Sequence, residues 1–152
     1  MTIFLTGTIA NTADDLDVKR FNKQILECQW IINMAEGRTK PSNHPAYLMY
    51  KDHIEWVKKY QECFIAYKDK DYGLCQSISK TAEKIQPSFI CEDLYNNFKR
   101  RLYTKDPNYY ERWAYLGNSY ANYYYIDGHW LKYENNKKEI DDTFGILKNG
   151  RQ

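Results

Sequence analysis

The chain has 152 residues, of which 43% are hydrophobic, a length and composition that suit one globular domain with a modest core. Its 22 Lys and Arg against 20 Asp and Glu give a formal charge of +2, so affinity for nucleic acid would have to come from local basic clusters and not from a general positive field. No apolar segment reaches the roughly 20 residues of a membrane helix, which excludes a membrane-spanning protein.

The first strong periodicity predicts a long helix, about residues 15 to 36. Apolar residues recur there at steps of three and four, as on one face of a helix: Phe21, Ile25, Cys28, Ile32 and Ala35. Asp14 or Asp15 is predicted to cap the start of this helix, and Gly37 to end it.

A second long helix is predicted for about residues 45 to 69, after the loop "GRTKPSNHP". Pro45 suits a first helical turn, and apolar residues continue with helical spacing through Tyr67. Weaker amphipathic stretches at about 74–85 and 91–103 predict two further helices, with Pro87 and Pro107 as boundaries.

The C-terminal part changes character. In "NYYYIDGHWLKY" two aromatic runs flank Asp127-Gly128, a pair preferred in two-residue hairpin turns. The fold class expected is therefore mostly α, a compact bundle led by two long helices with irregular connections, plus a small C-terminal β-hairpin. We divide the chain into a helical domain at 1–120, a hairpin at 121–134 and a polar tail with a mobile end at 135–152.

The four cysteines have neither CxxC spacing nor a histidine cluster beside them: Cys28, Cys63, Cys75 and Cys91. We therefore expect free thiols and no metal site. The N-terminus lacks the apolar core of a secretion signal, which favours a reducing cytoplasm.

Four separated stretches carry a resemblance to a known family. In chain order they are "MTIFLTG", "LDVKRFNKQILECQWIIN", "NHPAYLMYKDHIEWVKKYQECF" and "KRRLYTKDPNYYERWAYLG". In these stretches the chain resembles the small pyrimidine-dimer DNA glycosylases of the phage endonuclease V type and their bacterial relatives. The resemblance implies a DNA glycosylase with abasic-site lyase activity on a damaged or modified base in double-stranded DNA. It implies no cofactor and, for a viral protein, the host cytoplasm.

The resemblance assigns the nucleophile to Thr2. In such enzymes the initiator methionine is removed and the new α-amine attacks the deoxyribose C1′. The base is displaced, and an imine forms from which β-elimination breaks the strand. An α-amine has a reference pKa of about 7.7 to 8.0, so a useful share is unprotonated at neutral pH.

The family's proton-handling glutamate aligns with Gln24, which cannot transfer a proton. Glutamine can still orient a ribose or a water. Glu27 lies one turn later on the same face and either serves as the carboxylate or pairs with Lys23 at i,i+4. Restoring the family's carboxylate with Gln24→Glu is expected to create or raise glycosylase activity if the rest of the site is intact.

Ile3 stands where the phage enzymes place a basic residue beside the nucleophile, so one phosphate contact is missing. Other polar and basic residues are candidates for binding DNA phosphates: Arg20, Lys23, Asn43, His44, Lys99, Arg100, Arg101 and Lys105. The alternative interpretation of each residue is that its side chain is simply solvated at the surface.

Two other function classes remain open. The departures at Ile3 and Gln24 favour a catalytically silent DNA-binding or protein-interaction module on the same scaffold. A viral adaptor would use the aromatic hairpin to hold a protein partner.

Overall fold

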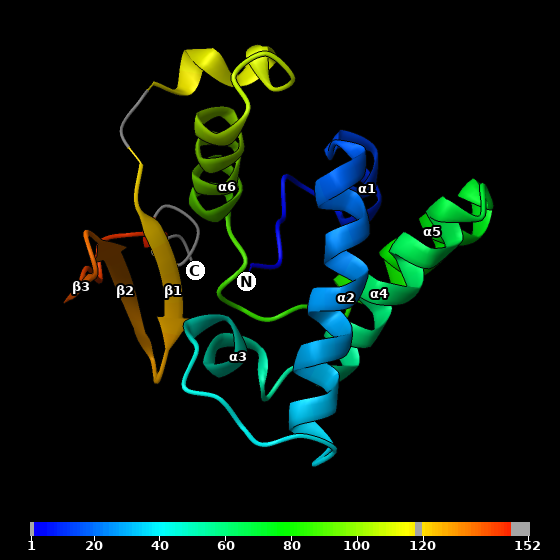
Figure 1. Cartoon of the computed structure of the whole chain (residues 1–152), viewed down its shortest axis with the longest axis horizontal. Coiled ribbons are helices and arrows are strands. Elements are labelled where there is room, and N and C mark those ends of the chain that lie inside the picture. The colour runs from blue at the N-terminus through cyan, green and yellow to red at the C-terminus, as the bar shows by residue number, and fades with distance from the viewer. Residues whose placement is uncertain (1, 118–119, 147–152) are drawn as a thin grey trace. The chain divides into compact units, whose positions relative to one another are not determined.

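The computed structural model describes residues 2–117 and 120–146, and the chain divides into two compact units, residues 1–87 and 88–152 (Figure 1). The helices of the first unit are α1 (Ile9–Asp15), α2 (Val18–Ala35), α3 (Pro45–Tyr50), α4 (Ile54–Lys68) and α5 (Tyr72–Glu83). The second unit contains α6 (Glu92–Lys105), the 3₁₀ helix η1 (Glu111–Leu116), β1 (Asn122–Ile126), β2 (His129–Glu134) and β3 (Lys137–Ile140). The mostly α fold with a small C-terminal hairpin is confirmed. Within the described ranges, the helices are too short or too polar to cross a membrane.

The predicted hairpin joins β1 to β2 through Asp127 and Gly128, whose φ angles are 53° and 83°. Two positive φ values in a two-residue loop are typical of a type I′ turn. A second tight turn, at Asn135-Asn136, adds β3 to the sheet in a segment that we predicted to be a polar tail. All of β3 is exposed, so it lacks the alternating apolar pattern that would have predicted a strand. The tail's end, residues 147–152, lies outside the described residues.

The start of the first long helix differs from the prediction. Asp17 caps α2, and its side chain accepts a hydrogen bond from the Arg20 backbone N–H. Asp14 and Asp15 instead lie in α1, a separate helix that the periodicity did not predict. Their carboxylates accept hydrogen bonds from side chains elsewhere in the first unit, which leaves the cap to the next aspartate in the sequence. At the other end, α2 ends at Ala35 with Glu36 as its C-cap, and Gly37 follows with a φ of +80°, the helix-ending position predicted for this glycine.

The predicted helix at 45–69 is broken into α3 and α4 by a turn at residues 51–53. The reason is tertiary: Tyr50 and Trp56 are both buried and stack at 5.5 Å with an interplanar angle of 7°. Six residues apart on a continuous helix, these rings would point in directions about 120° apart. The turn brings both rings into the same core.

Helices α2 and α4 pack through aromatic rings in the core of the first unit. Phe64 stacks on Phe21 at 4.9 Å and on Tyr60 at 4.5 Å. Phe64 and Tyr60 are fully buried and Phe21 nearly so. This contact fixes the inner face of α2 against α4, and the candidate site lies along that face.

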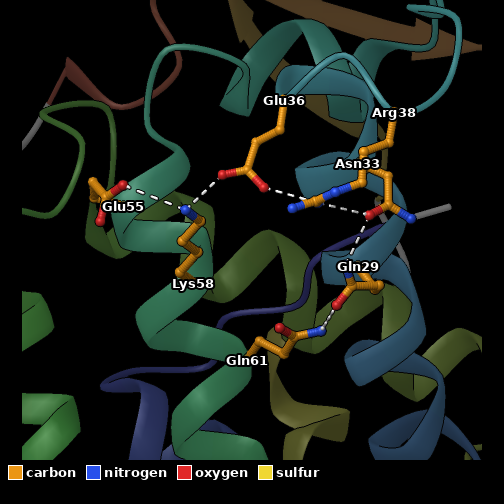
Figure 2. Close-up of polar contacts among 7 residues, drawn as sticks. All are labelled: Gln29, Asn33, Glu36, Arg38, Glu55, Lys58 and Gln61. Atoms are coloured by element: carbon orange, nitrogen blue, oxygen red, sulfur yellow. Dashed lines mark hydrogen bonds and ion pairs between the residues drawn. The ribbon is translucent and has the colours of Figure 1, made fainter.

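Beside this core, polar side chains bridge the two helices and the segment that follows α2 (Figure 2). The bridge consists of Gln29, Asn33, Glu36, Arg38, Glu55, Lys58 and Gln61. The Gln61 amide donates to Gln29 Oε1 at 3.1 Å, and the Lys58 ammonium lies 2.7 Å from the Glu36 carboxylate. The bridge ties the C-terminal end of α2 to α4.

We expect the Glu36–Lys58 pair to give a pH-dependent contribution to stability. The hydrogen bond from Lys58 lowers the pKa of Glu36 below its ordinary value of 4.5, and the reciprocal bond raises the pKa of Lys58 above 10.5. The contribution of the Glu36 carboxylate to stability is therefore present above pH 4.5 and is lost as the pH falls through its lowered pKa. The contribution of the Lys58 ammonium is present below pH 10.5 and is lost as the pH rises through its raised pKa.

Urea unfolding measures this contribution. Glu36→Gln should lower the free energy of unfolding at neutral pH, and its difference from wild type should shrink as the medium becomes acidic. Glu83→Gln, an exposed change on α5, serves as the matched control. A Glu36→Gln deficit that is unchanged by acid would contradict the assignment.

Candidate functional site

Gln24 is the most completely bonded polar side chain on the inner face of α2. It is 1% exposed, and its Oε1 accepts from the Phe4 backbone N–H at 2.9 Å and from the Tyr60 hydroxyl at 3.0 Å. Its Nε2 donates to the Thr2 carbonyl at 3.1 Å. These partners fix the amide's orientation, because a backbone N–H only donates and a carbonyl only accepts. Gln24 therefore holds the N-terminal segment against α2.

Tyr60, on α4, also holds the N-terminal segment, and we call Gln24 and Tyr60 together the clamp. The single hydroxyl hydrogen of Tyr60 is shared between the Phe4 carbonyl, at 2.7 Å, and Gln24 Oε1, at 3.0 Å. Both the N–H and the carbonyl of Phe4 are therefore hydrogen-bonded. Burial raises the pKa of Tyr60 well above its ordinary value, which keeps the phenol protonated as a donor. Tyr60 is not among the residues predicted for the site, because its position on the helix predicts only a core residue.

Glu27 lies one turn after Gln24 and is 8% exposed. Burial raises the pKa of Glu27 above its ordinary value of 4.5, while the α-amino charge at the start of the chain and the charge of Lys23 act to lower it. Within the described residues, no ion pair closer than 4 Å joins Lys23 to Glu27. A desolvated carboxylate under the influence of an amine can both hold and release a proton.

Thr2 is half-buried, and its carbonyl is the group that Gln24 anchors. The α-amino charge at the start of the chain lowers the pKa of His44 after the larger effect of burial, as it also lowers that of Glu27.

Arg20 and Lys23 differ in how available their charges are. The Arg20 guanidinium pairs with the capping Asp17 at 3.2 Å, whereas Lys23 is exposed. Lys23 is thus the more accessible cation on this part of α2.

His44 and Asn43 lie before α3. His44 Nδ1 accepts from the Ala46 N–H at 3.1 Å and so caps the helix, and its ring meets the edge of Trp30 at 6.1 Å between centroids. Asn43 is exposed. An acceptor role for Nδ1 and a lowered pKa favour a neutral imidazole with its proton on Nε2.

The basic residues predicted on α6 do not form one exposed cluster in the second unit. Arg101 is 5% exposed and lies over the Phe98 ring, and Arg100 Nε donates to the Leu116 carbonyl at 3.1 Å. Lys99 lies 5.8 Å from the centre of the Trp113 ring, and Lys105 is exposed.

Arg112, which the sequence analysis missed, lies 4.3 Å from the centre of the same Trp113 ring. Its exposed position within "NYYERW", between aromatic residues, was the available signal. Lys99 and Arg112 thus place two cations near one indole.

No group of histidine, cysteine, aspartate or glutamate within residues 2–117 and 120–146 could hold a metal ion. Comparison with known protein families finds one match: residues 1–69 fit the model described as pyrimidine dimer DNA glycosylase. Neither a search of curated proteins nor a search of solved structures gives a match. The family match covers α1 to α4 and confirms the resemblance for that stretch, which includes Thr2, Gln24 and Glu27.

Proposed function

We propose that this chain, whose residues 1–69 match the pyrimidine dimer DNA glycosylase family, is a DNA-repair glycosylase with abasic-site lyase activity. The observation that carries the proposal is the pairing of an anchored chain start with a buried carboxylate. Gln24 fixes the Thr2 carbonyl, and Glu27, one turn later on the same helix, is 8% exposed and has a pKa that burial raises. A nucleophilic amine needs a fixed position and a nearby group that transfers protons. Gln24 supplies the fixed position, and Glu27 supplies the proton-transferring group.

In the proposed reaction, removal of Met1 leaves the Thr2 α-amine as the nucleophile. The amine attacks C1′, the bond from C1′ to the base breaks, and the base takes up a proton as it leaves. The amine nitrogen loses its protons as the sugar ring opens and the imine forms. β-Elimination then breaks the bond between C3′ and the 3′ oxygen, and the phosphate leaves with the cut strand.

Glu27 is assigned the proton transfers. Its raised pKa keeps a share of the carboxyl groups protonated closer to neutrality than an exposed glutamate would be, so it can supply a proton to a leaving group. Once ionised, it can accept the proton that the amine or C2′ gives up. Gln24 acts as a positioning residue, because all of its described polar contacts are with the N-terminal segment and Tyr60.

For DNA phosphates, we assign Lys23 in the first unit and Lys99 with Arg112 in the second. The exposure of Lys23 and the aromatic ring beside the other two support the choice. Arg20, Arg100 and Arg101 are already engaged within the protein and are weaker candidates.

Borohydride trapping tests the nucleophile. The wild-type protein, mixed with a duplex containing one abasic site and reduced, should give a covalent protein–DNA adduct whose cross-linked peptide begins at Thr2. Inserting one alanine between Met1 and Thr2 moves the amine by one residue, about 3.5 Å of chain, and should abolish strand cleavage. Duplex binding should be retained, because the phosphate contacts are unchanged.

The same experiment separates the proposal from a silent binding module. Binding to the duplex without any adduct, from a protein whose intact mass shows that Met1 has been removed, would reject the enzyme and favour the module. Intact mass is measured first, since retained Met1 would itself remove the proposed nucleophile.

A further inference from the structure

Two thiols of the first unit lie in contact in its core, away from the candidate site. Cys63 on α4 and Cys75 on α5 have their Sγ atoms 3.1 Å apart, and Cys63 Sγ also lies 3.3 Å from the Cys75 carbonyl oxygen. Both cysteines are reduced, with exposures of 0% and 2%. A disulfide requires an S–S distance of about 2.0 Å, so a movement of about 1 Å would close the bond.

A surface cleft leads to one of these thiols. The cleft has a volume of about 420 Å³ and lies between α1, α4 and α5, where Asn11, Tyr67 and Gln76 contribute to its walls. Cys75 lines it, whereas Cys63 does not. A small solute can therefore approach the pair from the Cys75 side.

The two thiols are not equivalent in their surroundings. Burial and the hydrogen bond with Cys75 raise the pKa of Cys63 well above its ordinary value, so Cys63 stays protonated. The S–H of Cys63 donates to the Cys75 carbonyl oxygen, at an S···O distance of 3.3 Å. Because Cys75 lines the cleft and Cys63 does not, Cys75 is assigned as the attacking sulfur and Cys63 as the resolving one.

We propose that Cys63 and Cys75 form a reversible oxidation site that takes a peroxide through the cleft and closes to a disulfide joining α4 to α5. The Cys75 thiolate attacks one peroxide oxygen and the O–O bond breaks; the departing hydroxide takes up a proton to give water, and Cys75 becomes a sulfenic acid. Cys63 sulfur then attacks the Cys75 sulfur, the S–O bond breaks, and a second water leaves with the Cys63 proton. Peroxide gains two electrons and the two thiols lose two.

Hydrogen peroxide on the full-length protein tests the site directly. We expect two of the four thiols to be lost, with a decrease in intact mass equal to two hydrogen atoms and full reversal by dithiothreitol. Trypsin cleaves between the two cysteines at Lys68 and Lys70, so a cross-linked peptide pair would identify the bond without any variant. Retention of all four thiols, or oxygen addition at Cys75 without a cross-link, would overturn the proposal.

Variants test the route and the roles. Gln76→Trp should narrow the cleft and slow oxidation, whereas Ser77→Trp, at an exposed neighbour that does not line the cleft, should not. Cys63→Ser should leave Cys75 as a trappable sulfenic acid, and Cys28→Ser should oxidise like wild type. Equal rates for the two tryptophan variants would reject entry through the cleft.

Discussion

Replacing Glu27 with glutamine should lower the rate of strand cleavage at an abasic site by roughly 10²-fold to 10⁴-fold, the usual contribution of general acid–base catalysis. Glutamine preserves the side chain's size but cannot transfer protons. Because burial raises the pKa of Glu27, ionising this carboxyl group opposes folding at neutral pH. Replacing the carboxyl group with an amide should therefore leave the free energy of unfolding unchanged or slightly higher. Single-turnover cleavage gives the rate, and urea unfolding checks the fold.

Two controls define what the Glu27 result means. Glu83→Gln, at an exposed position on α5, should keep full activity. Lys23→Gln removes a cation whose charge acts to lower the pKa of Glu27, and it should weaken duplex binding without a comparable loss of single-turnover rate at saturating protein. Wild-type turnover in Glu27→Gln would exclude the proton-transfer role.

Gln24→Glu should destabilise the protein at neutral pH instead of raising its activity. One oxygen of the introduced carboxylate would face the Thr2 carbonyl, two acceptors in a site that is 1% exposed, unless the carboxyl is protonated. The folded pKa of the new group would therefore lie above the unfolded value of about 4.3, and each pH unit between the two would cost about 1.4 kcal/mol. Stability should be best at acidic pH and fall as the pH rises.

Urea unfolding at pH values on both sides of neutrality measures this effect. Gln24→Met removes the same hydrogen bonds without adding a charge, so its loss of about 1 to 3 kcal/mol for each buried group left unsatisfied should not depend on pH. A Gln24→Glu protein that is as stable as wild type and cleaves faster would mean that position 24 belongs to the catalytic machinery and not to the clamp.

Local signals in the sequence predicted much of the fold. The apolar stripe of α2, the glycine that ends it and the Asp127-Gly128 turn each depend on a few neighbouring residues, so they can be read without the tertiary structure. The break between α3 and α4 could not be predicted, because it follows from the stacking of Tyr50 on Trp56 within the assembled core.

The candidate site was less predictable for the same reason. Gln24 acquires its role from Phe4 and Tyr60, which are 20 and 36 residues away. Helical spacing correctly put Gln24 and Glu27 on one face of α2. It could not reveal that Gln24 is hydrogen-bonded to the N-terminal segment or that burial raises the pKa of Glu27. Likewise Arg101 looks like a surface cation in "KRRLY" and is buried.

The anchor on the Thr2 carbonyl bears on the entropy of any reaction at the adjacent amine. Chain ends usually fray, and a terminal nucleophile would then search many orientations before each productive encounter. Here the hydrogen bond to Gln24 fixes the carbonyl, and only the backbone torsion about the Cα–C bond separates it from the nitrogen of the same residue, which is the α-amine in the proposed reaction. Most of the orientational freedom is therefore lost when the protein folds, before substrate arrives, which raises the effective concentration of the amine at its target.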